Sequence, residues 1–368
     1  MHLYLHIPYC ARKCPYCDFN SVAGRDGEMS AYVEALLLEV SRLPRGPYTT
    51  IFIGGGTPTS LPPRLMERFL AGVRAHISLA ADYEWTCEAN PGTSDAERFR
   101  LLADHGVNRL SLGIQSTHDH HLRFLGRVHD AAEGERAVAL AVATVPRVNA
   151  DLIMGLPDQT SAEFAQDLEL FRRFDLSHAS VYHLAYETGT EFYARKQRGE
   201  LSEIDAERSR LLFTDLSARL AELGMSPYET SNFSRPGQEC RHNLAYWTMR
   251  DYQAAGAGAV STVAGVRLTR EKHSGKYIAA ITSGGDATWR REELTVLERR
   301  REAWMLGLRL SVGVATADLL ALGDEAQRWR PLIAPLVAAG VLADVGTHLR
   351  LTAAGLPVQD EVTVALMP

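Results

Sequence analysis

The sequence predicts an α/β protein in which a partial (β/α)6 barrel is followed by a smaller α+β module. Short apolar runs alternate with amphipathic helical stretches through about residue 185, which is typical of a parallel sheet because parallel strands need crossover connections. Polar and glycine residues recur just after the apolar runs, where a barrel has its mouth. Near the C-terminus the pattern changes to two helices and a short hairpin.

The expected elements follow one another in a regular order. Six strands are expected at residues 3–6, 50–53, 83–88, 109–113, 148–153 and 179–184. Five helices are expected between them, at residues 30–42, 64–77, 94–105, 131–143 and 161–174, with a longer helix at 204–223. The C-terminal module should hold helices at 294–310 and 325–338 and a hairpin at 341–345 and 348–351, a winged-helix-like pattern. We therefore expect a barrel at 1–200, a barrel extension at 201–290 and the module at 291–368.

Composition and charge narrow the function classes. The chain has 368 residues, of which 46% are hydrophobic and 23% charged, as in an ordinary globular protein. Its formal net charge of −6 offers no global basic field, so the winged-helix-like module is expected to pack or cover a substrate rather than bind nucleic acid. The opening MHLYLHIPYC lacks a signal-peptide pattern, and we expect a cytoplasmic protein whose membrane contact, if any, is peripheral.

Three of the five cysteines fall within eight residues. Cys10, Cys14 and Cys17 have the spacing C-x3-C-x2-C, and no fourth cysteine follows closely. Iron–sulfur clusters are held by cysteine thiolates, commonly four, so three would leave one iron of a 4Fe-4S cluster without a protein ligand. The alternative is a structural zinc loop completed by a distant residue such as Cys87 or a histidine.

A run of three glycines, 54–56, precedes Thr57 and Pro58 at the end of the second expected strand. Glycine lets another molecule approach the backbone closely. The run is neither a G-x-G-x-x-G dinucleotide fingerprint nor a P-loop. A tight strand-to-loop turn would explain it equally well.

The cysteine loop and the glycine run together resemble the radical S-adenosylmethionine (SAM) superfamily. Within it, LYLHIPYC, GGGTPT, CEANPG, LSLGIQS, LGRVHD and DLIMGLP resemble the oxygen-independent coproporphyrinogen oxidase group, in order and over nearly the whole chain. The resemblance implies that the cysteines hold a 4Fe-4S cluster and that its open iron takes the amino and carboxylate groups of SAM. One electron would then cleave the sulfonium to a 5′-deoxyadenosyl radical. The implied cofactor-binding positions are Tyr4, Tyr16, Gly55, Gly56, Thr57, Glu88, Gln115, Arg127, Asp151 and Ala185.

Two features distinguish this chain from the oxidases of that group. The oxidases carry a further cysteine two residues after the third ligand, where this chain has Phe19. The segment RHNLAYW contains an HNxxYW pattern that resembles the heme chaperone branch, HemW. That resemblance implies heme binding and delivery to respiratory-chain hemoproteins. His242 is a candidate axial ligand. A structural role for His242 stays equally open, and Cys240 is a less favoured ligand.

The leading interpretation is therefore a radical-SAM-type heme chaperone. Its main rival is oxygen-independent oxidative decarboxylation of coproporphyrinogen III, and a third possibility is a degenerate fold with structural zinc. The sequence leaves open whether SAM is cleaved productively, which hemoprotein receives the heme, and whether the protein forms a homodimer.

Overall fold

One twelve-stranded sheet organises residues 1–293 of the computed structural model, which describes all 368 residues of the chain. Its centre is six parallel strands that pair in the order of the sequence, with Leu5 beside Ile53 in the first pair. These strands are β1 (His2–Ile7), β4 (Tyr48–Gly55), β5 (Leu79–Ala89), β6 (Arg109–Gln115), β7 (Arg147–Met154) and β8 (His178–His183). The predicted (β/α)6 arrangement is confirmed.

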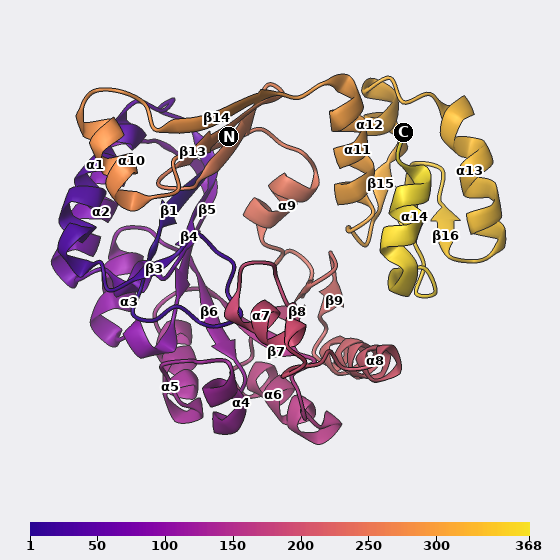
Figure 1. The fold of residues 1–368 in the computed structure, drawn as a ribbon, viewed down its shortest axis with the longest axis horizontal. Helices are drawn as coiled ribbons and strands as arrows, with labels where there is room; N and C mark the ends of the chain where they lie inside the picture. Colours follow the sequence, from indigo (N-terminus) through magenta and orange to yellow (C-terminus); the bar gives the residue numbers. More distant parts are fainter.

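Helices cover the outer side of the curved sheet (Figure 1). All five expected helices are present, as α1 (Met29–Ser41), α2 (Pro63–His76), α3 (Ala96–Asp104), α5 (Ala131–Val142) and α6 (Ser161–Arg173). They bury large side chains such as Tyr32, Phe69 and Phe164 against the strands, and this burial stabilises the barrel. The sequence did not indicate α4 (Asp119–Phe124) or α7 (Glu191–Gln197), because two turns or fewer are too short to show a helical period.

Both ends of the sheet extend beyond the six parallel strands. The expected long helix is α8 (Ala206–Glu222), and after it the chain adds strands to either edge. The added strands are β9 (Ser226–Pro227), β10 (Asn232–Ser234), β11 (Tyr252–Ala255), β12 (Val260–Val263), β13 (Val266–Arg270) and β14 (Thr288–Glu293). Only β11 pairs in parallel, with β1; the others pair antiparallel. Most of them are too short to show an alternating pattern, and β12 and β13 are only partly buried, so the sequence did not indicate these strands. Helix α10 (Ser274–Thr282) separates β13 from β14 and packs on α1.

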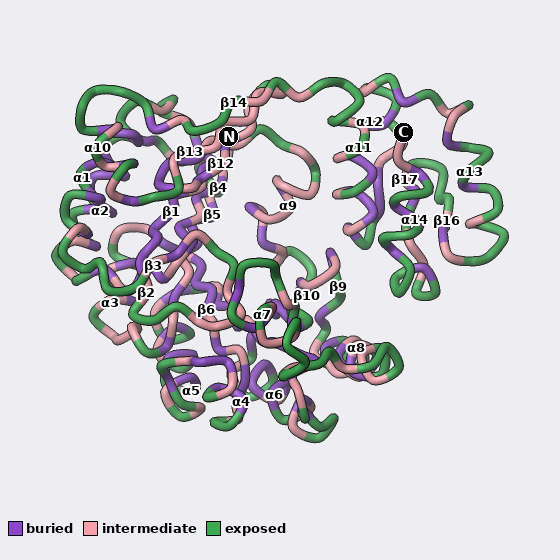
Figure 2. The backbone as a smooth tube through the Cα atoms, in the orientation of Figure 1, coloured by how far each residue is buried: buried purple, intermediate pink, exposed green.

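The C-terminal module has a core of its own. It contains α11 (Val296–Gly307), β15 (Val314–Ala315), α12 (Thr316–Ala321), α13 (Ala326–Ala338), β16 (Leu342–Asp344), β17 (His348–Leu351) and α14 (Gln359–Leu366). Trp304 and Trp329 meet edge to face at its centre, with ring centroids 6.3 Å apart. Figure 2 shows buried residues along the barrel strands and a second set in this module. The expected winged-helix-like pattern is thus present, with α12, α14 and a third strand added. None of the helices has the length and apolar character needed to cross a lipid bilayer.

Candidate functional site

Three free thiols lie on the loop after β1, at the carboxyl end of the parallel strands. Cys10 ends β2 (Tyr9–Cys10), which pairs with β3 (Val22–Ala23). A tight turn follows, in which the Cys17 N–H donates to the Cys14 carbonyl at 3.1 Å. All three thiols are partly buried and line a cavity of about 420 Å³.

The distances between these thiols help to decide whether they fit a single metal ion or a cluster. The only set of three His, Cys, Asp or Glu side chains whose ligand atoms all lie within 4.8 Å of one another is elsewhere, so the three sulfurs do not converge that closely. Zinc–sulfur bonds of about 2.3 Å would bring them nearer than that. Cys87 and Cys240 are buried and do not line the cavity, although His183 does. The donor set therefore fits a group larger than a single ion, as a 4Fe-4S cluster is.

Each of the three glycines of the 54–56 run is packed against the chain itself. A Cβ on Gly55 would lie 2.4 Å from the His6 ring, and Gly55 has a φ of 113°. A Cβ on Gly56 would lie 2.7 Å from the carbonyl oxygen of Tyr9, at the start of the cysteine loop. The sequence predicted that another molecule would approach the backbone here. In the structure, the chain's own backbone already lies this close to Gly56. The run holds the cysteine loop against the end of β4, where Thr57 donates its N–H to the Tyr9 carbonyl at 2.7 Å.

Two carboxyl groups face the cavity from β5 and β7. Glu88 accepts the N–H of Gly55 at 3.1 Å, and Asp151 accepts the side-chain amide of Asn149 at 2.7 Å. Burial, reinforced by the charge of Asp151, raises the pKa of Glu88 to about 8. Burial also raises the pKa of Asp151 to about 6. Two carboxyl groups that are costly to ionise alone are suited to a ligand carrying positive charge.

A guanidinium and a strained residue complete the rim. Arg127 donates to the Gly113 carbonyl at 2.8 Å and places Nη1 3.5 Å from the Cys14 sulfur and 3.4 Å from the Tyr16 hydroxyl. Its Nε–H is buried without a partner. Gln115 has a φ of 70°, an uncommon conformation for a residue other than glycine, at the point where the β6–β7 register shifts. Such strain is frequently found at ligand sites.

The cavity gathers most of the residues singled out in the sequence. Those that line it are Cys10, Cys14, Tyr16, Cys17, Gly56, Thr57, Glu88, Gln115, Arg127, Asp151 and Ala185. Tyr4, Gly55 and His242 do not line it. Tyr4 and Gly55 instead line a neighbouring cavity of about 300 Å³ inside the barrel, where the Tyr4 hydroxyl lies 3.0 Å from His6 Nδ1.

His242 lies on α9 (Arg241–Trp247), a short helix on the inner side of the curved sheet (Figure 1). The side chain is fully buried, and both ring nitrogens are engaged. Nδ1 lies 2.7 Å from the Thr50 hydroxyl and Nε2 lies 2.8 Å from the Tyr246 hydroxyl. Burial lowers the pKa of His242 to about 3, so the ring is neutral. This geometry fits the structural alternative, since an axial role would require one of these two bonds to break.

A buried carboxylate holds the start of α9 in place. Glu84 accepts the backbone N–H groups of Arg241 at 3.2 Å and His242 at 3.1 Å, and it pairs with Arg147 at 2.7 Å. Cys240, the residue before the helix, offers no side-chain cap, so Glu84 supplies the acceptor that a helix N-terminus needs. Burial raises the pKa of the Cys240 thiol to about 11. That thiol is therefore poorly suited to bind a metal as thiolate.

Several further residues line the cavity without having been assigned a role from the sequence. They are Arg109, Ser180, His183 and Asn243. Three of them belong to barrel strands, and His183 ends β8 as Gln115 ends β6. The rule that polar strand ends meet at the mouth of a barrel predicts this place for His183. Asn243 could not be placed, because nothing in the sequence positions α9.

The fold and the three-cysteine loop together define a protein of the radical SAM type. A sequence profile described as the radical SAM superfamily matches residues 4–171, and one described as the HemN C-terminal domain matches residues 294–358. The structure resembles that of the radical SAM enzyme coproporphyrinogen III oxidase (HemN) from Escherichia coli, with a TM-score of 0.84, 23% identity and coverage of 99% of this chain and 89% of that one.

Sequence comparison places the chain more narrowly. It is 36% identical to the heme chaperone HemW of Escherichia coli K12, over 96% of this chain and 95% of that protein. It is 37% identical to the heme chaperone HemW of Synechocystis, over 86% and 79%. It is also 33% identical to the mouse mitochondrial radical S-adenosyl methionine domain-containing protein 1, over 100% and 87%. The chain belongs to the HemW family of radical SAM proteins.

Proposed function

We propose that this protein is a radical-SAM-type heme chaperone in which Cys10, Cys14 and Cys17 hold a 4Fe-4S cluster. The observation that carries the proposal is the 420 Å³ cavity shared by these thiols and by the enclosed carboxyls of Glu88 and Asp151. When bound, the cluster would supply one electron to SAM. The carboxyls would offset the positive charge of the SAM sulfonium, and the unpartnered Nε–H of Arg127 would remain available to an anionic group.

A second cleft, between the barrel and the C-terminal module, supports heme as the cargo. Its volume is about 700 Å³, within the range of about 300–1,000 Å³ that is usual for cofactor sites. Tyr246, Trp247 and Tyr252 line it on the barrel side, and Met305 of α11 lines the opposite side. Figure 1 shows α9 and α11 facing each other across this space. Flat aromatic side chains on one wall suit a planar macrocycle.

The cleft also has groups for the charged edge and the iron of heme. Arg250 and Arg299 line it, are exposed and form no ion pair in the structure, so they can bind propionate carboxylates. Met249 and Met305 also line the cleft, and methionine is a known axial ligand of heme iron. No histidine lines the cleft. We therefore assign iron ligation to one of these methionines, and we assign His242 to positioning Tyr246.

Heme titration of the anaerobically reconstituted protein tests this assignment. Met305→Ala or Met249→Ala should shift the Soret band and weaken heme binding, and Arg299→Glu should weaken binding without moving the band. His242→Ala should lower the melting temperature and leave the heme spectrum of the folded protein unchanged. If His242→Ala moves the Soret band while both methionine variants keep it, the axial ligand is His242.

Coproporphyrinogen oxidation remains the second candidate, because the fold of the bacterial oxidase matches nearly the whole chain. Incubation of the cluster-loaded protein with SAM, a reductant and coproporphyrinogen III discriminates between the two. We expect heme binding without release of carbon dioxide or formation of a decarboxylated porphyrinogen. Turnover that Cys14→Ala abolishes would establish the oxidase function.

We further propose that the heme passes to respiratory-chain hemoproteins at the membrane surface. The module carries exposed apolar side chains that a protein or membrane surface could cover, among them Val312, Val345 and Val364. Heme-loaded protein should transfer heme to an apo-cytochrome in vesicles, and Val364→Glu should slow the transfer without altering heme loading. Gel filtration of the same variant tests whether Val364 instead contributes to a contact between two copies of the chain.

A further inference from the structure

A second cluster of potential metal ligands lies outside both clefts, between α4 and the first turn of α6. The ligand atoms of His120, His121 and Glu163 all lie within 4.8 Å of one another. His120 Nε2 is 3.2 Å from Glu163 Oε1, and His121 Nε2 is 3.8 Å from Glu163 Oε2. We propose that these three side chains form a binding site for one divalent metal ion of the zinc class, with a fourth position open to water.

The strongest sign of a ligand at this place is an unpartnered nitrogen. His121 is 2% exposed, and its buried Nε2 has no hydrogen-bond partner. A buried polar atom without a partner is costly, and such atoms in native structures commonly mark an ion or water. Burial and the neighbouring His120 ring lower the pKa of His121 to about 4, so the imidazole is neutral and able to ligate at neutral pH.

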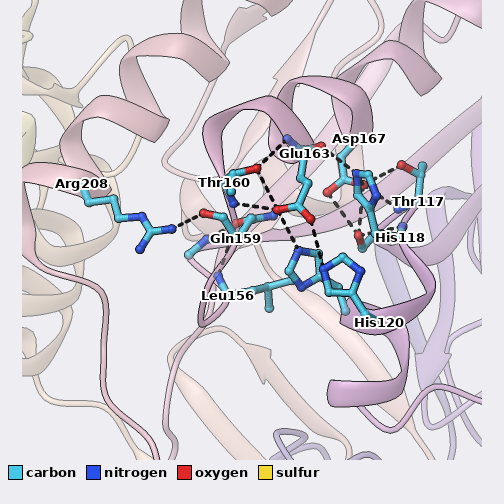
Figure 3. A network of polar contacts seen from close by, with 12 residues as sticks. Thr117, His118, His120, Leu156, Gln159, Thr160, Glu163, Asp167 and Arg208 are labelled. Atoms are coloured by element: carbon cyan, nitrogen blue, oxygen red, sulfur yellow. Dashed lines mark hydrogen bonds and ion pairs between the residues drawn. The ribbon is translucent and has the colours of Figure 1, made fainter.

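The carboxylate is also prepared for this role. Glu163 Oε2 accepts the backbone N–H and the hydroxyl of Thr160, both at 2.8 Å, in a capping box at the start of α6. These bonds lower the pKa of Glu163 to about 2 and fix its rotamer. Oε1 is left to face His120, as Figure 3 shows. The carboxylate is thus ionised and pointed toward the imidazoles before any metal arrives.

Neighbouring contacts anchor the segment that leads into the two histidines. Adjacent helical residues normally diverge, yet the rings of His120 and His121 lie 3.9 Å apart between centroids. The preceding segment is anchored to α6 at two points. His118 Nε2 lies 3.1 Å from the Glu163 carbonyl oxygen, and the buried Asp167 accepts the hydroxyl of Thr117 at 2.7 Å (Figure 3). These bonds hold the start of α4 against α6, which limits the reorganisation needed to bind a metal.

The ligand chemistry indicates the class of metal. Two imidazoles and one carboxylate form a mixed nitrogen and oxygen set of the kind that zinc accepts in sites keeping a fourth, open position. No thiol is present, so the set differs from the cysteine loop, and no dense group of carboxylates favours calcium. A bound ion would join α4 to α6, and α4 leads directly into Arg127, which contacts Cys14.

The test is zinc binding to protein that already carries its cluster, so that the cysteines are occupied. After equimolar Zn²⁺ and desalting, elemental analysis should give about one zinc per chain with iron and sulfide unchanged. His120→Ala removes a half-exposed side chain and leaves no buried cavity. It should lower zinc affinity by about tenfold or more, the scale seen even for lost supporting contacts. His76→Ala, which removes an exposed histidine on α2, is the matched control and should bind zinc as the wild type does.

A stability measurement gives a second readout. Zinc should raise the melting temperature of the wild type and of His76→Ala, and a chelator should reverse the effect, whereas His120→Ala and Glu163→Gln should not respond. Glutamine can keep the capping contact, so Glu163→Gln separates ligation from helix capping. The proposal is overturned if His120→Ala binds as much zinc as the wild type, or if wild-type protein binds zinc only as it loses iron and sulfide. Neither result would bear on heme binding.

Discussion

SAM binding should depend on pH through Glu88, and the size of the effect can be worked out from the structure. With a pKa of about 8, Glu88 is half ionised at pH 8 and about one hundredth ionised at pH 6. If the cationic ligand requires the carboxylate, its affinity should fall about 50-fold over this interval. Asp151, with a pKa of about 6, adds about a twofold loss at the lower end. The affinity for SAM falls as the pH falls because a cation binds the ionised carboxyl group and lowers its pKa.

Glu88→Gln isolates this contribution. Glutamine keeps the size of the side chain and can still accept the N–H of Gly55, but it cannot ionise. Calorimetry of SAM binding to cluster-loaded protein should show a large loss of affinity for Glu88→Gln at pH 8.5. Near pH 6 the variant and the wild type should converge, because wild-type Glu88 is then neutral. An affinity ratio between the two proteins that is the same at both pH values would refute the role of Glu88 as a charge partner.

Three further outcomes are expected. Cys14→Ala should abolish the brown cluster chromophore, whereas Cys87→Ala should retain it because Cys87 is buried away from the cavity; iron and sulfide analysis checks both. Gly56→Val should reduce cluster retention as well as SAM binding, since its side chain would displace the backbone at Tyr9; an effect on SAM alone would contradict this reasoning. Glu84→Gln should destabilise the protein by about 2–3 kcal/mol in denaturant unfolding, because it weakens charged hydrogen bonds to Arg147 and α9; an unchanged midpoint would remove the capping role.

The sequence was most informative where local pattern and chain order determine the outcome. Six apolar runs separated by helices define a parallel sheet, and the carboxyl ends of its strands must share one edge. That rule was enough to place Glu88, Gln115 and Asp151 near the cysteine loop, as the structure does. At the glycine run the sequence predicted the close approach of another molecule, or a tight turn. It did not predict that Gly56 packs on Tyr9 of the same chain, because only the folded chain brings Tyr9 within reach.

Features set by contacts between distant segments were beyond the reach of sequence reasoning. His242 is buried because Thr50, 192 positions earlier, meets its ring. The proposed zinc ligands also come from distant parts of the sequence. A helix and a strand, α5 and β7, separate His121 from Glu163, and only folding brings the two side chains together. A motif indicates which residue types occur together along the chain. It does not show which of their atoms are already hydrogen-bonded, and that decides whether a histidine can ligate.

The two clefts adjoin each other, which gives the HNxxYW segment a physical role. Tyr182 and Asn243 line both the cysteine cavity and the cleft between barrel and module. On α9, His242 holds the Tyr246 hydroxyl from inside the barrel, while Tyr246 and Trp247 line the outer cleft. Glu84 anchors this helix to the sheet. Because α9 forms part of the wall between the clefts, a shift of this helix on heme binding would alter the SAM cavity and so change the affinity for SAM. Thermodynamic linkage then requires that SAM binding change the affinity for heme by the same factor.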